Sequence, residues 1–240
     1  MLIGQDFEKI QIELFGIIIQ EPNGVISDLL MSFVSISLGI FLIQKNKRSE
    51  FEKWWIYFFI LYGVSAFLGA CGHGLYYYFG VFGKFPNWIT GIPIIYFIEL
   101  AMISLYSDLR LKKILRTISL MKMILVYLIL AVLCLTIPIQ EKPQIPFLPI
   151  AFNTIFGVIL SAGFIGYHFY KKEKSFGKIV IGVLIMIPSA FVFLLKINPK
   201  PWFDKNDVSH LLLTLGIIFF YLGIIQVKKN SSELIHNSTT

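Results

Sequence analysis

Two of the chain's four histidines, His73 and His210, lie near the ends of two different hydrophobic segments. Asp207 precedes His210 by three residues, so both can point from one face of a helix. Zinc takes imidazole nitrogen and carboxylate oxygen, and a catalytic zinc keeps one position for water. We therefore predict that His73, His210 and Asp207 are metal ligands. Asp28, which opens another apolar segment beside Ser27, is a candidate general base for the metal-bound water.

A non-catalytic interpretation of the same residues stays open. Polar groups at a wet helix boundary can simply hydrogen-bond one another, and such contacts hold helices together without chemistry. Ionisable groups inside membrane segments are nevertheless rare and usually functional, because burying them is costly. The shared depth of these groups therefore favours a site.

Composition indicates an all-α integral membrane protein. Hydrophobic residues make up 56% of the 240 residues, charged residues 15%, and mean hydropathy is +0.75. A bilayer core of about 30 Å needs about 20 apolar residues in a helix. Seven segments qualify: 25–44, 54–72, 88–106, 118–137, 148–170, 177–195 and 208–227. We expect a seven-helix bundle over 21–227, preceded by an interfacial amphipathic segment over 1–20 and followed by a cytoplasmic tail over 228–240.

Basic residues predict the orientation of this bundle. They concentrate after the first, third, fifth and seventh segments and are sparse in the alternate connections. The positive-inside rule therefore places the N-terminus outside and the C-terminus in the cytoplasm of a plasma (inner) membrane protein. The net charge of +7 is assigned to this asymmetry and to contact with membrane lipids, not to nucleic acid.

Residues 1–20 are not expected to be a cleavable signal, because Asp6, Glu8 and Glu13 accompany a single early lysine. Apolar residues recur there near helical spacing, which predicts a short amphipathic helix lying along the outer interface. A partly inserted plug is the alternative.

The polar pattern resembles that of the CREST seven-helix hydrolases, which include alkaline ceramidases and adiponectin receptors. The likeness rests on Glu21 with Ser27-Asp28-Leu29, on the small-residue turn ending at His73, and on Asn206-Asp207-Val208-Ser209-His210. It implies a zinc ion and cleavage of an amide or ester in a lipid, with Ser27 and Asp28 assisting the water. Asn206 stands where the family has a third histidine ligand, so only two ligands match directly.

Three classes of function remain open from the sequence. The first is a zinc-dependent hydrolase of a lipid-like amide or ester. The second is a receptor, sensor or transporter that uses the same cluster, for which Glu99 is the one acid at mid-depth. The third is a non-catalytic membrane partner. Substrate, metal identity and oligomeric state are not predicted. His168, near the cytoplasmic end of its segment, is expected to be interfacial.

Overall fold

The computed structural model describes residues 1–44 and 49–237, with side chains as far as Val227. Within this part of the chain, seven helical spans are long and apolar enough to cross a membrane, which confirms the predicted seven-helix bundle. Their bounds are Pro22–Ile43, Glu50–Gly74, Tyr76–Ile103, Leu109–Thr136, Gln144–Lys172, Lys174–Leu194 and Lys205–Val227.

Several spans combine more than one helical element. The third span joins α3 (Tyr76–Phe79), η1 (Gly80–Lys84) and α4 (Phe85–Ile103). The fifth joins α6 (Gln144–Val158), the π-helix η2 (Ile159–Ile165) and α7 (Gly166–Lys172), and the sixth joins η3 (Lys174–Phe176) to α8 (Gly177–Leu194). The remaining spans are α1 (Pro22–Ile43), α2 (Glu50–Gly74), α5 (Leu109–Thr136) and α9 (Lys205–Asn237).

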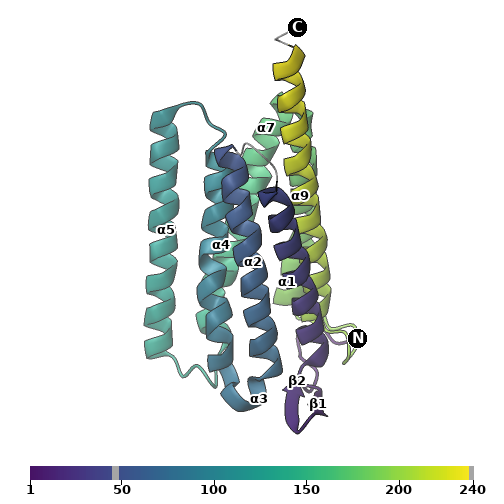
Figure 1. Ribbon diagram of the computed structural model, residues 1–240. Helices are drawn as coiled ribbons and strands as arrows, with labels where there is room; N and C mark the ends of the chain where they lie inside the picture. Colours follow the sequence, from purple (N-terminus) through teal and green to yellow (C-terminus); the bar gives the residue numbers. More distant parts are fainter. Residues whose placement is uncertain (45–48, 238–240) are drawn as a thin grey trace.

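The first and last helices of the bundle are neighbours in space. Helix α1 packs against both α2 and α9, while α2 also packs against α4, and α8 packs against α9 (Figure 1). Helix α5 stands at the edge of the bundle, where it contacts α4 and α6 (Figure 1). Residues at the ends of α1, α2 and α9 can therefore meet although they are far apart in sequence.

Aromatic packing fills the centre of the bundle. Trp55 and Phe58 of α2 contact each other edge to face, with ring centroids 5.2 Å apart, and Phe220 of α9 lies 5.2 Å from Trp55. Each of these side chains is almost fully buried. Close approach of α8 and α9 requires Gly182, because a Cβ atom there would lie 2.7 Å from the Phe220 ring. This core fixes α2 and α9 relative to each other.

The N-terminal segment is a β-hairpin and not the predicted amphipathic helix. Strands β1 (Gln11–Leu14) and β2 (Ile17–Gln20) pair antiparallel around Phe15 and Gly16, whose φ angles are 53° and 77°. Positive φ at both central residues is the type I′ turn that joins two-residue hairpins. Gly16 adopts a positive φ without strain, and the isoleucine-rich second strand favours an extended backbone, so the apolar spacing that suggested a helix does not decide the structure.

The chain before β1 is tied to the segment that precedes α9. Leu2 exchanges two backbone hydrogen bonds of 2.8 Å with Asn198, and Asp6 forms ion pairs with Lys196 and Lys205. Partial burial alone would raise the pKa of Asp6, but hydrogen bonds and charge from the two lysines outweigh it and lower that pKa to about 2. These contacts hold residues 1–20 over one end of the bundle, called here the hairpin end.

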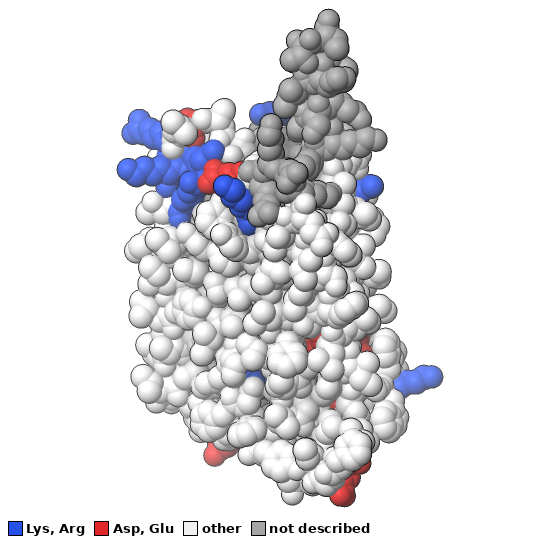
Figure 2. Space-filling model, viewed as in Figure 1, with Lys and Arg blue, Asp and Glu red and all other residues white. Residues whose placement is uncertain are grey.

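Charge is distributed unevenly between the two ends. Figure 2 shows lysine and arginine gathered at the end opposite the hairpin, with uncharged residues over the middle of the visible face. There, Glu50 pairs with Lys112 and Arg116. Further basic residues that were used to predict the orientation lie at 45–48 and in the tail, where the structure does not describe the side chains. Under the positive-inside prediction, the hairpin end faces outward.

Candidate functional site

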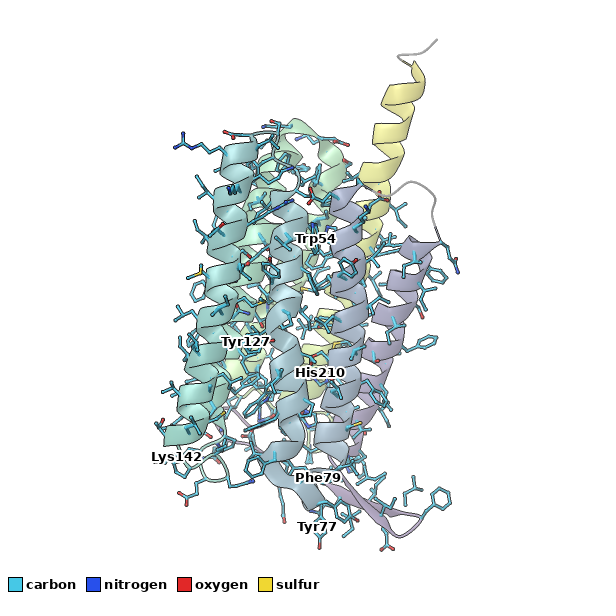
Figure 3. All side chains as sticks on the ribbon, turned by 60° about the vertical axis from the view of Figure 1, so that its left-hand side comes forward. Trp54, Tyr77, Phe79, Tyr127, Lys142 and His210 are labelled. Carbon is cyan, nitrogen blue, oxygen red and sulfur yellow. The ribbon has the colours of Figure 1, made fainter. Side chains whose placement is uncertain are left out.

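The two predicted histidines meet at the hairpin end. His73 lies in the last turn of α2 and His210 in the second turn of α9, and their ring centroids are 6.4 Å apart. Figure 3 shows His210 in the half of the bundle that contains Phe79 and Tyr77, while Trp54 lies in the other half. This proximity agrees with the sequence-based expectation that the two imidazoles converge.

The carboxylate of Asp28 lies between the two rings. Its Oδ1 is 3.5 Å from His210 Nε2, and its Oδ2 is 4.0 Å from His73 Nε2. Asp28 is 3% exposed, although it belongs to the second turn of α1. Gly69 makes room for it, because a Cβ atom at that position would lie 2.8 Å from Asp28 Oδ2. A small residue on α2 thus lets the α1 carboxylate reach both imidazoles.

The second nitrogen of each imidazole has its own partner. His73 Nδ1 lies 2.5 Å from Glu21 Oε2, and His210 Nδ1 lies 2.8 Å from the Ser27 hydroxyl oxygen. Such contacts fix ring orientation and tautomer in acid–base and metal sites. Each histidine is thereby held through its Nδ1 atom, His210 by a side chain of α1 and His73 by the residue that precedes this helix.

Glu21 is a participant that the sequence did not single out as a site residue. It also binds Lys9 and lies 4.0 Å from Lys84 Nζ. Its backbone is left-handed (φ 50°, ψ 54°), a conformation that costs a residue with a side chain roughly 1–2 kcal/mol. That conformation precedes Pro22 at the start of α1, and it accompanies a carboxylate shared by His73 and two lysines. The sequence feature that could have indicated this role is an acidic residue, Glu21, directly before the proline that starts α1.

Asp207 has a different role from the predicted one. Its Oδ2 accepts a hydrogen bond of 3.0 Å from the backbone N–H of Asp204, while Asp204 Oδ1 accepts from the N–H groups of Asn206 and Asp207. This reciprocal pattern caps the start of α9. Asp207 Oδ1 also lies 3.3 Å from the Ser27 hydroxyl oxygen. The carboxylate is thus engaged in holding the helix start.

The predicted zinc ligands do not assemble into a metal centre. Among the side chains that the structure describes, those of residues 1–44 and 49–227, no group of three or more His, Cys, Asp or Glu is placed to hold a metal ion. His73 and His210 turn their Nε2 atoms toward Asp28, and Asp207 is turned toward its capping contacts. The side chains as they lie therefore do not fit the zinc that the family resemblance implies.

Two apolar cavities meet the cluster, and His210 lines both of them. One, of about 210 Å³, runs into the bundle from Asp28 and His210 past Phe58 and Ile95. The other, of about 250 Å³, lies between α1 and α9 beside Ser27. A smaller polar cavity of about 30 Å³ lies at the hairpin end, between the N-terminal segment and the starts of α1 and α9. The cluster thus stands where polar surface and apolar space meet.

The mid-depth acid Glu99 belongs to another interface. It binds Ser119 and Lys122 of α5, and so fastens that edge helix to α4. His168 stacks on Tyr106 with ring centroids 6.3 Å apart, remote from the cluster. Glu99 is therefore used in helix packing, which weakens the transporter interpretation.

Fold and site together define the class: a multi-pass membrane protein with a carboxylate–imidazole cluster joining its first, second and last spans. The chain belongs to a family of unknown function, DUF6962, whose model matches residues 24–229. This range contains Ser27, Asp28, His73 and His210, whereas Glu21 precedes it. No curated protein and no solved structure matches the chain.

Proposed function

We propose that this protein is a membrane-embedded hydrolase that cleaves an amide or ester bond in a lipid-like substrate. The observation that carries the proposal is the placement of the buried Asp28 carboxylate 3.5 and 4.0 Å from two imidazoles. One of these rings, His210, also faces two apolar cavities. An imidazole and a carboxylate that can transfer protons, next to apolar cavities that can hold a hydrocarbon chain, suit the hydrolysis of an amide or ester that carries such a chain.

The residues divide the chemical work as follows. His210 contacts the cavities and acts as the proton acceptor and then as the donor to the leaving group. Asp28 orients its ring and stabilises the imidazolium that forms, as the carboxylate does in other imidazole–carboxylate pairs. Glu21 positions His73, which places a second imidazole on the far side of Asp28. The likeness to CREST hydrolases supports the same substrate class.

The proposed localisation is the plasma membrane, with the cluster just beneath the outer surface. This placement rests on the basic residues at the opposite end (Figure 2) and on the positive-inside rule. A substrate in the outer leaflet then lies at the depth of the cavity between α1 and α9.

The test is hydrolysis by purified protein in lipid nanodiscs, using a panel of fluorogenic long-chain esters and amides. Asp28→Asn and His210→Ala should each lower kcat/KM by about 100-fold or more, because proton transfer contributes roughly 10²–10⁴-fold. His168→Ala is the matched histidine control, since His168 stacks on Tyr106 outside the cluster.

Wild-type protein that cleaves none of the panel while remaining folded would overturn the proposal. The cluster would then be a hydrogen-bonded clasp joining α1, α2 and α9, and the same variants would alter only thermal stability. Elemental analysis of the same preparations tests the zinc prediction: one zinc per chain, lost in His73→Ala and His210→Ala but kept in His168→Ala, would show that the site rearranges to bind metal.

A further inference from the structure

The side chains of Ser27, His210 and Asp28 lie in a row as a hydroxyl, an imidazole and a carboxylate, and the first two are hydrogen-bonded. The Ser27 oxygen is 2.8 Å from His210 Nδ1, and the opposite nitrogen of that ring is 3.5 Å from Asp28 Oδ1. A base within hydrogen-bond reach of a hydroxyl, itself oriented by a third group, is the recognised signature of an activated nucleophile. The ring nitrogens are exchanged relative to serine proteases, in which Nε2 faces the serine.

Activation of Ser27 requires one particular tautomer of His210. In that tautomer the ring proton is on Nε2, the nitrogen that faces Asp28. That leaves the Nδ1 lone pair free to accept the Ser27 proton. The other acceptors near the hydroxyl are farther away, with Gly24 O at 3.1 Å and Asp207 Oδ1 at 3.3 Å. A metal on Nε2 would require the opposite tautomer, so activation of Ser27 and metal binding by His210 exclude each other.

The hydroxyl is reachable from the bilayer side of the bundle. Ser27 and His210 both line the 250 Å³ cavity between α1 and α9. The walls of this cavity include Ile26, Leu30 and Leu211, whose exposed fractions are 64%, 54% and 50%. In a membrane those side chains face hydrocarbon, so the cavity opens sideways to lipid acyl chains.

On the basis of the hydrolase function above, we infer that Ser27 is the nucleophile and that the acyl chain lies in the α1–α9 cavity. The Ser27 oxygen attacks the ester or amide carbonyl as its proton passes to His210 Nδ1. The carbon–oxygen or carbon–nitrogen bond then breaks, and the leaving group takes that proton. Water, deprotonated by the same nitrogen, attacks the acyl ester and releases the fatty acid, and the proton returns to Ser27.

A covalent probe tests this assignment independently of any substrate. Wild-type protein in nanodiscs is treated with a long-chain alkyl fluorophosphonate, which phosphonylates an activated serine and releases fluoride. Mass spectrometry should find one label per chain, on the peptide that contains Ser27. Labelling should fall at least about 100-fold in Ser27→Ala and His210→Ala, as expected when a nucleophile or its base is lost.

Ser35→Ala is the matched control, because Ser35 lies two turns further along α1 and donates to the Phe59 carbonyl. It should label like wild type. The cavity is tested with Leu30→Trp, which should slow the long-chain probe by about 10-fold while leaving a short-chain fluorophosphonate unaffected.

The outcomes separate this inference from the hydrolase proposal. Lipid hydrolysis that persists in Ser27→Ala, without labelling of wild type, overturns the nucleophile and leaves the hydrolase with direct attack by water. Labelling of Ser27 that depends on His210 supports the nucleophile even if no amide or ester in the panel is cleaved, and in that case the proposed hydrolysis is what fails. Equal labelling of folded wild type and His210→Ala also refutes the assignment.

Discussion

Gly69→Ala should displace Asp28 from its place between the imidazoles. A Cβ atom at Gly69 would lie 2.8 Å from Asp28 Oδ2 and 3.1 Å from Asn87 Nδ2, whereas ordinary contact begins at 3.4 Å. The carboxylate must therefore shift by about 0.6 Å (3.4 − 2.8) or the helices must separate. Asp28 is 3% exposed and flanked by both rings, so it can shift only toward the 210 Å³ cavity that it lines, which takes it away from its place between the imidazoles.

The expected magnitude comes from two opposing effects. Overpacking of this kind costs about 1–3 kcal/mol, and alanine gains roughly 1 kcal/mol over glycine inside a helix. The net destabilisation should be about 0–2 kcal/mol. Activity should fall by more than stability implies, since a misplacement near 1 Å can lower a rate by about 100-fold. We expect a loss of about 10-fold or more in kcat/KM.

The assay compares Gly69→Ala with Gly166→Ala, a buried helical glycine at the other end of the bundle. The nearest side-chain atom to a Cβ at Gly166 is 3.6 Å away, so the methyl group fits. Circular dichroism on heating measures stability, and the ester and amide panel measures turnover. Gly166→Ala should be at least as stable as wild type and fully active. If Gly69→Ala matches Gly166→Ala in both measurements, Asp28 is not held as described.

Three further expectations concern parts of the molecule outside the cluster. The stabilising contribution of the Asp6 ion pairs is fully present above pH 3.8 and is lost as the pH falls through about 2. Between pH 4 and 2, amide hydrogen exchange over residues 1–6 of the wild type should therefore approach the exchange in Asp6→Asn. A wild-type exchange pattern that does not change over this range would refute the ion pairs. Glu99→Gln should lower the free energy of unfolding by about 1–3 kcal/mol, because it leaves the charge of Lys122 without its partner. The double variant Glu99→Gln/Lys122→Met should lower it by less, because both charges are removed. Equal losses in the two variants would argue against the ion pair. A reporter fused after Thr240 should read as cytoplasmic and one before Met1 as external, and a C-terminal reporter found outside would reverse the orientation.

The seven spans and the approach of the two histidines could be predicted from the sequence. Hydropathy determines where a helix crosses, and crossing direction determines the depth of each polar residue. Those two quantities were enough to place Asp28, His73 and His210 at one end. Which helices are neighbours in the bundle depends on side-chain packing, and an apolar composition alone is compatible with many arrangements.

Other features depend on helix rotation and local turn geometry, which hydropathy does not specify. Asp207 was expected to face the metal, but its position three residues after Asp204 makes it part of a helix cap. Glu21 was part of a recognised pattern, yet its contact with His73 depends on a left-handed backbone before Pro22. The hairpin was missed because a two-residue turn at Phe15 and Gly16 overrides apolar spacing.

The closure of the cluster by the first and last spans has a consequence for biosynthesis. Ser27 and His210 are 183 residues apart, so at about 5–20 residues per second roughly 10–40 s pass between the synthesis of one and of the other. During that interval, Asp28 sits in the nascent chain without the α9 imidazole that it contacts in the finished protein. The insertion machinery or its lipid surroundings must therefore tolerate an acid in the first segment that has only His73 of α2 beside it, and every truncated chain that lacks α9 leaves the ribosome with the cluster incomplete.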